Sequence, residues 1–167
     1  TSMSWSKIFA VTAMFMFVFG IATIDCALAG EKQKLKSHGT TYTTKSELVE
    51  VGDDEGHVIG VYENKGIAFN EITGTRMVDQ GRGIIDINTK TGRGFIRGYG
   101  ITTDKDGDKM IRAYEGKPVA KGKSKGDWNY VKGTGKYEGI KGGGTWSSYG
   151  LTPKQSYWEA EGEVEMP

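Results

Sequence analysis

Cysteine is almost missing from this 167-residue sequence, in which Cys26 is the single example. One cysteine cannot form an intrachain disulfide, and it does not supply the paired thiolates of a zinc site. Proline is also scarce, with three residues, and glycine follows no three-residue period, so the chain is not collagen-like. A surplus of charge is missing too, since 22 basic and 21 acidic residues leave a net charge of +1. This balance argues against a protein that binds nucleic acid by neutralising phosphates.

Glycine, by contrast, is abundant, with 26 residues, and aromatic residues make up 11% of the chain. A glycine inside a helix costs about 1 kcal/mol relative to alanine, so this composition disfavours a helical bundle. The length suits one domain, since domains commonly span roughly 100–200 residues. Together these features predict a small all-β protein.

The first part of the sequence has the features of a secretory signal peptide. Residues 8–24 carry no charge, Lys7 precedes them, and the motif A-L-A occupies 27–29. A basic start, an apolar stretch and an A-x-A motif are the three parts of such a peptide. We therefore expect residues 1–29 to be a signal peptide and the protein to be exported, to a periplasm or out of the cell.

Two other interpretations of this segment remain open. One is an uncleaved membrane anchor, because seventeen apolar residues lie at the lower limit for a membrane span. The other is a lipoprotein acylated on Cys26, which Asp25 disfavours because a small residue is expected at that place. After cleavage the mature chain has no cysteine. Residues 30–37 (GEKQKLKS) are then expected to be a flexible N-terminus, and residues 38–167 to be the folded domain.

The folded domain reads as a succession of strands. β-rich segments recur about every 10–15 residues, with glycine, asparagine and aspartate between them, as in strands joined by tight turns. The predicted fold is an all-β, eight-stranded antiparallel β-barrel, because closure leaves no unpaired edge and internal glycines let strands bend. A β-sandwich is the alternative. The expected strands are 38–51, 56–62, 66–71, 76–88, 94–103, 109–117, 128–133, 143–149 and 157–164, with turns or loops at 63–66 and 121–127 and at most one helical turn within 136–143.

Alternation along the last segment separates an inner from an outer face. Successive strand residues point to opposite faces of a sheet. The predicted inner face holds Trp158, Ala160, Gly162 and Val164. The glutamates at 159, 161 and 163 fall on the other face, which is expected to meet solvent.

One stretch carries a family resemblance. Residues 133–146 read GTGKYEGIKGGGTW, after GHVIGVYENKGIAF at 56–69 and the turn DKDGDK at 104–109. This order resembles the bacterial allene-oxide-cyclase-like proteins, relatives of plant allene oxide cyclases and dirigent proteins. The resemblance implies a calycin-like eight-stranded barrel, a bacterial source, a cavity for a small and largely apolar molecule, and a trimeric assembly. It does not carry the cyclase activity, because no catalytic set of either plant group is matched here residue by residue.

No cofactor or metal site is expected from the motifs. The two histidines, His38 and His57, lie outside any zinc-binding pattern. The segment 104–115 (DKDGDKMIRAYE) resembles a calcium loop, but Lys109 stands where that loop needs glycine. We therefore interpret it as a solvated hairpin turn.

Aromatic and arginine side chains on the strands are the candidates for a ligand cavity. The alternatives are aromatic residues that fill the core and charged residues on the outer wall. We expect a protein that binds a small hydrophobic or amphipathic molecule; a cyclase- or isomerase-type enzyme and a self-associating structural module are the other hypotheses. An enzyme would need inward ionisable groups such as Arg97, Arg112 or Glu115. The predicted cavity residues are Tyr62, Arg97, Tyr99, Arg112, Tyr114, Trp128, Trp146 and Trp158.

Overall fold

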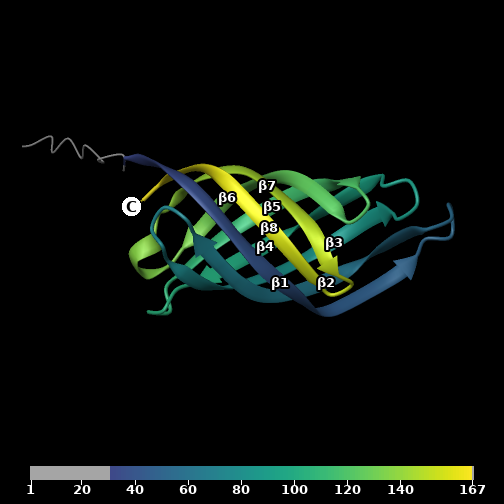
Figure 1. The fold of residues 1–167 in the computed structure, drawn as a ribbon, viewed down its shortest axis with the longest axis horizontal. Coiled ribbons are helices and arrows are strands. Elements are labelled where there is room, and N and C mark those ends of the chain that lie inside the picture. Colours follow the sequence, from purple (N-terminus) through teal and green to yellow (C-terminus); the bar gives the residue numbers. More distant parts are fainter. Residues whose placement is uncertain (1–30, 167) are drawn as a thin grey trace, which may run out of the picture.

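A computed structural model describes residues 31–166 as a closed, antiparallel barrel of eight strands (Figure 1). The predicted fold class is therefore confirmed, while the predicted signal peptide lies outside the described residues. Within 31–166, no helix is long and apolar enough to cross a membrane. The strands are β1 (Lys32–Glu50), β2 (His57–Asn70), β3 (Arg76–Asn88), β4 (Gly94–Thr103), β5 (Lys109–Ala120), β6 (Lys123–Gly133), β7 (Lys141–Thr152) and β8 (Gln155–Glu165).

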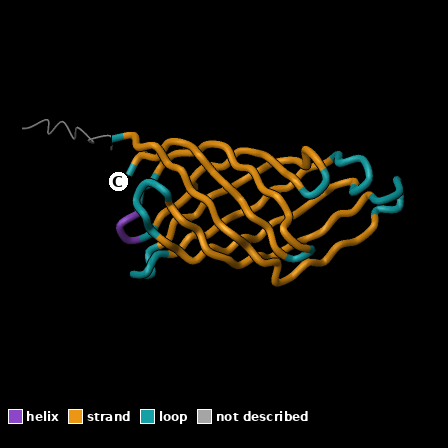
Figure 2. The backbone as a smooth tube through the Cα atoms, viewed as in Figure 1, coloured by secondary structure: helices purple, strands orange, loops and turns teal. Residues whose placement is uncertain are grey.

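Each strand pairs with its neighbours in the chain, and β1 closes the barrel against β8. The closing register runs from Lys32 opposite Glu165 to Tyr42 opposite Gln155. In Figure 2 the strands wind obliquely around the barrel, and the loops gather at its two ends. Closure gives every strand a neighbour on each side, and beyond Tyr42 the last part of β1 continues in a hairpin with β2 alone.

The two segments expected at 56–62 and 66–71 are one strand, β2. The polar stretch at 63–66, read as a turn, continues the strand without interruption. Asn64 is opposite Thr43 on β1 and Gly81 on β3, so both neighbours hold it in the sheet. The prediction was wrong because polarity and a glycine suggested a turn where the strand merely crosses a polar part of the barrel.

Two other strands, β1 and β6, begin five or more residues before their predicted starts. β1 begins at Lys32, so most of the expected flexible segment 30–37 is strand paired with β8. Its outward lysines face glutamates across the pair, as in Lys34 opposite Glu163, and such opposite charges stabilise a pair of strands. β6 begins at Lys123, inside the loop predicted at 121–127, because a two-residue turn suffices there.

One end of the barrel is closed by an apolar cluster. Buried Met110, Tyr137 and Ile140 form its centre, with Met77 and Tyr130 packed against them. Tyr137 belongs to η2 (Gly135–Tyr137), a single 3₁₀ turn that overlaps the start of the segment 136–143, where at most one helical turn was predicted. This turn lies at the same end as the C-terminus in Figure 2. The cluster is the floor of the barrel, and the loops β1–β2 and β3–β4 lie at the other end (Figure 1).

Candidate functional site

An interior cavity of about 400 Å³ lies above this floor. Side chains from all eight strands line it, and the turns near Gly122 and Pro153 border it at the end away from the floor. Its volume falls in the range of about 300–1,000 Å³ typical of small-molecule sites. The barrel is therefore not completely filled by its own side chains.

Successive inward residues of β5 mark the layers of this interior. Met110 belongs to the apolar floor, Arg112 follows at the base of the cavity, and Tyr114 follows in its wall. Hydroxyl side chains, among them Ser148 and Ser156, line the part farther from the floor. The cavity therefore combines an ionic base, an aromatic wall and polar groups toward the loops.

The base of the cavity is an ion pair between Arg112 and Asp79. One guanidinium nitrogen, Nη2, donates to both carboxylate oxygens of Asp79, at 2.8 and 3.1 Å, and Nη1 donates to the hydroxyl of Thr102 at 2.6 Å. The side chains of Arg112 and Asp79 are 19% and 4% exposed. Burial opposes the charge of Arg112, but the nearby Asp79 carboxylate more than offsets this, and the pKa of Arg112 is raised. The pair is therefore charged, buried and internally neutralised.

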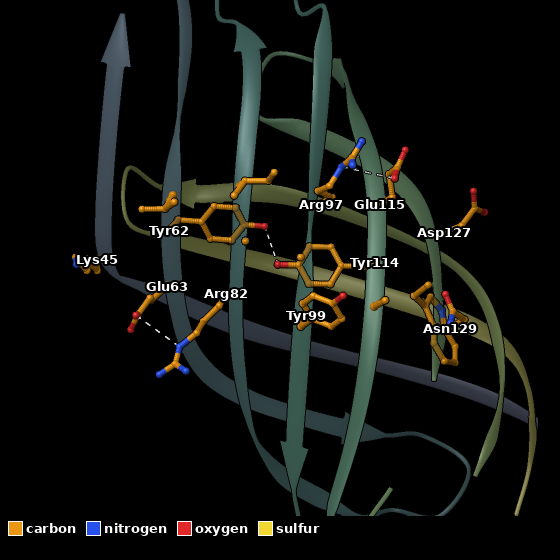
Figure 3. Close-up of a pocket in the computed structure, with 16 residues that line it drawn as sticks. Lys45, Tyr62, Glu63, Arg82, Arg97, Tyr99, Tyr114, Glu115, Asp127 and Asn129 are labelled. Atoms are coloured by element: carbon orange, nitrogen blue, oxygen red, sulfur yellow. Dashed lines mark hydrogen bonds and ion pairs between the residues drawn. The ribbon is translucent and has the colours of Figure 1, made fainter. Parts of the chain in front are cut away.

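Two tyrosines meet across the wall of the cavity. The hydroxyl oxygens of Tyr62 on β2 and Tyr114 on β5 lie 2.7 Å apart, and Figure 3 shows the two hydroxyls facing each other. Burial raises the pKa of Tyr62 and of Tyr114 above the ordinary value, so both phenols are neutral at physiological pH. One hydroxyl donates to the other, which leaves one further O–H hydrogen in the pair.

Glycines provide the space for these large side chains. A Cβ atom on Gly83 would lie 2.6 Å from the Tyr62 hydroxyl, and one on Gly98 would lie 2.7 Å from the Tyr114 hydroxyl. A real Cβ does not tolerate such contacts, so both tyrosines lie directly over glycine backbone. The same relationship holds for Arg112 over Gly100, Trp146 over Gly116 and Trp158 over Gly39.

The three tryptophans of the cavity differ in their polar contacts. Trp128, which is 5% exposed, donates from Nε1 to the carbonyl of Thr145 at 3.1 Å. Trp146 donates to the carbonyl of Asp127 at 3.1 Å. Trp158 Nε1 is buried and has no hydrogen-bond partner among the described residues. The ring of Trp158 also lies 5.5 Å from the guanidinium carbon of Arg112, within range of a cation–π interaction.

Six of the eight predicted cavity residues line the interior together: Tyr62, Arg112, Tyr114, Trp128, Trp146 and Trp158. Arg97 and Tyr99 do not. They occupy the outward positions of β4, where Arg97 is 52% exposed and interacts with Glu115, and Tyr99 is 59% exposed. They line a second hollow of about 860 Å³ (Figure 3), and Tyr62, Tyr114 and Trp128 border both this hollow and the interior cavity. The inward positions of β4 belong to Ile96, Gly98 and Gly100, so the structure places Arg97 and Tyr99 apart from the other six.

The lining residues that the sequence did not predict include two polar side chains. Asp79 is buried and holds Arg112, and Asn64 lines the cavity with a buried Oδ1 that has no partner among the described residues. The segment around Asp79 carries polar and apolar residues on both faces, so its alternation did not identify an inner side. The only sequence feature that pointed to Asp79 was its acidic side chain within a predicted strand, between Val78 and Gln80.

The turn at 104–108 is held by its own contacts. Asp104 accepts hydrogen bonds from the amides of Asp106 and Asp108 at 2.8 and 3.0 Å, and from the hydroxyl of Tyr137 at 3.2 Å. Lys136 lies 2.5 Å from the same carboxylate, and it lowers the pKa of Asp104 to about 2. In the described part of the chain, no group of three or more His, Cys, Asp or Glu residues is arranged to hold a metal.

Comparisons with known proteins identify the fold. No protein-family model and no curated protein matches the chain. The pterocarpan synthase dirigent protein GePTS1 matches with a TM-score of 0.52 at 10% identity, over 91% of this chain and 98% of that protein. The pterocarpan synthase dirigent protein PsPTS1 matches with a TM-score of 0.50 at 11% identity, over 83% of this chain and 97% of that protein. The barrel is therefore related in fold to dirigent proteins, and at these identities the likeness concerns the fold alone.

Proposed function

We propose that this protein binds a small hydrophobic or amphipathic molecule in the interior of its barrel. The observation that carries the proposal is the cavity of about 400 Å³ between the apolar floor and the loops. Its wall presents the broad apolar surfaces of Tyr62, Tyr114 and Trp146, with polar side chains distributed among them. Sites for small molecules are commonly built in this way, with apolar walls for affinity and a few polar groups for orientation.

A cyclase- or isomerase-type enzyme, of the kind that includes allene oxide cyclase, is the second candidate. Arg112 favours it, because it is an ionisable side chain that faces the cavity. Its charge is already paired with Asp79, however, and Arg97 and Glu115 point outward, at 52% and 66% exposure. A guanidinium is also a poor proton donor at physiological pH. Binding is therefore favoured over catalysis.

We also propose that the protein is exported and that it forms a trimer. Both rest on sequence features, namely the apolar segment at 8–24 and the resemblance around 133–146. The exposed apolar side chains of the outer wall, such as Val61, Ile84 and Tyr99, are compatible with contacts between copies. A self-associating structural module would use the same wall and would leave the interior cavity without a ligand.

Native mass spectrometry of the protein purified from its own compartment tests the proposal. We expect a mass increment from a co-purified small molecule, and the same spectrum gives the oligomeric state. Ser148 lines the cavity, while the preceding Ser147 lies on the opposite face of β7. Ser148→Phe should therefore abolish the increment, and Ser147→Phe should retain it. An increment that survives Ser148→Phe but not Ser147→Phe would place the ligand outside the barrel and overturn the proposal.

A further inference from the structure

The interior cavity has no unpaired charge to offer a ligand. Of the residues that line it, Asp79 and Arg112 are the charged ones, and they neutralise each other through two hydrogen bonds. A carboxylate moved into an apolar cavity without a counter-charge loses its hydration and gains no compensating ion pair. An anionic ligand would therefore find no net positive charge in the cavity lining.

The guanidinium of Arg112 is held in place on several sides. Nη1 donates to Thr102, Nη2 donates to Asp79, and the group lies over Gly100, where a Cβ would come within 2.6 Å of its central carbon. The Trp158 ring covers it from β8 at 5.5 Å. Reorienting this group toward a ligand would break the contacts to Thr102 and Asp79 together, so its positive charge stays directed at Asp79.

Neutral hydrogen-bonding groups, in contrast, remain available beside Gly81. The Tyr62–Tyr114 pair has one O–H hydrogen left to donate, and the amide of Asn64 has no partner for its oxygen among the described residues. The two groups meet at Gly81. A Cβ there would lie 3.7 Å from the Tyr114 hydroxyl and 3.8 Å from Asn64 Cβ, which is ordinary contact, so the position has space beside it.

We propose that the cavity takes a neutral amphiphile, whose uncharged oxygen lies over Gly81 between Asn64 and Tyr114, and that it rejects the matching carboxylate. Alcohols suit this position best, because a hydroxyl both accepts from the tyrosine pair and donates to the amide oxygen. Ketones and esters can accept a hydrogen bond from the tyrosine pair but cannot donate one to the amide oxygen. The inference rests on the proposed function and names the class of molecule that the site binds.

Decanol, decanoate and decylamine test the charge selectivity, because they share one chain length and differ in charge. Isothermal titration of the unmodified protein should show decanol binding, with both ions at least about tenfold weaker because neither finds a counter-charge. Decanoate that binds as tightly as decanol would overturn the inference but leave the proposed function intact. Failure of all three to bind would count against the proposed function itself.

Two variants test the residues named. Asp79→Asn leaves the charge of Arg112 unpaired, so decanoate should gain affinity and the order of decanol and decanoate should reverse. Gly81→Ala places a methyl group where the ligand oxygen is expected, without a close contact, and should weaken decanol binding about tenfold or more while the protein stays folded. If Asp79→Asn does not fold, Gly81→Ala still decides, because unchanged decanol binding in that variant would overturn the assigned position.

Discussion

The hydroxyls of Tyr62 and Tyr114 meet at 2.7 Å across two strands that contribute only glycine between them. Tyr62 is opposite Gly83, Gly83 is opposite Gly98, and Gly98 is opposite Tyr114. The two side chains therefore extend toward each other over a bare strip of backbone. This arrangement makes one wall of the cavity and depends on both tyrosines and both glycines.

The tyrosine pair should behave as a coupled unit in stability measurements. Tyr62→Phe leaves the buried Tyr114 hydroxyl without its partner, and an unsatisfied buried polar group costs about 1–3 kcal/mol. Tyr114→Phe should have a similar effect. The double variant should cost less than the sum of the two, because the second substitution removes the orphaned group. Urea denaturation of the four proteins measures this coupling, and strictly additive losses would show that the hydroxyls do not interact.

The glycine strip, formed by Gly83 and Gly98, should not tolerate the addition of a single methyl group. In Gly98→Ala the new Cβ would lie 2.3 Å from the carbonyl of Arg82 and 2.7 Å from the Tyr114 hydroxyl. Overpacking of this kind costs about 1–3 kcal/mol or more. Gly81→Ala is the matched control, since its nearest contacts are at 3.7 and 3.8 Å, and its stability should stay within about 1 kcal/mol of the parent. Equal melting temperatures for the two variants would contradict this account.

The same strip explains which parts of the interior could be predicted from the sequence. In β8, alternation placed Trp158 inside and Glu159 outside, and the structure agrees. In β4 the inward positions are occupied by Gly98 and Gly100, and side chains from β5 fill the space over them. The large residues Arg97 and Tyr99 are therefore on the outside. The residue pattern of one strand does not show that side chains of the neighbouring strand occupy the space over its glycines.

Long-range pairing accounts for the other differences from the prediction. The lysines of 32–37 form a strand because glutamates of β8 face them, more than a hundred residues away in the sequence. Asp79 is held in its ion pair by Arg112, which lies 33 residues further along the chain. The closed eight-stranded barrel itself was predictable, because recurrent β-rich segments, tight turns and abundant glycine are local features.

The Arg112–Asp79 pair should be far more costly to break than an exposed pair on neighbouring strands. Asp79→Ala leaves a buried guanidinium without its counter-charge, and such a loss costs about 3–5 kcal/mol. Arg97→Ala serves as the control, because its partner Glu115 is 3.8 Å away and both side chains are more than half exposed. Exposed pairs contribute about 0–1 kcal/mol. Denaturation midpoints compare the two, and similar losses would contradict the assignment of Arg112 to the interior.

His57 should link the stability of the barrel to pH. Its Nδ1 lies 2.7 Å from Asp53 in the β1–β2 loop, and its Nε2 lies 2.9 Å from Asp86 on β3. These contacts, that to Asp86 most strongly, raise the pKa of His57, because both carboxylates favour the imidazolium form. The folded pKa then exceeds the unfolded value of about 6.5. The stabilisation is therefore complete below that value and is lost as the pH rises through the folded pKa.

NMR titration of the His57 ring measures this pKa directly, and a value at or below the ordinary one would contradict the prediction. His57→Gln removes the proton uptake, so its unfolding free energy should vary less with pH than that of the parent on the alkaline side of about pH 6.5. Asp86→Asn should lower the pKa of His57 more than Asp53→Asn, following the order of the two contributions.

Because Asp53 belongs to the loop and Asp86 to the barrel wall, loss of the imidazolium charge weakens the attachment of the loop to β3. Amide exchange in residues 52–56 should accordingly become faster as the pH rises through the folded pKa, beyond the ordinary increase in intrinsic exchange, and it should lack this additional step in His57→Gln.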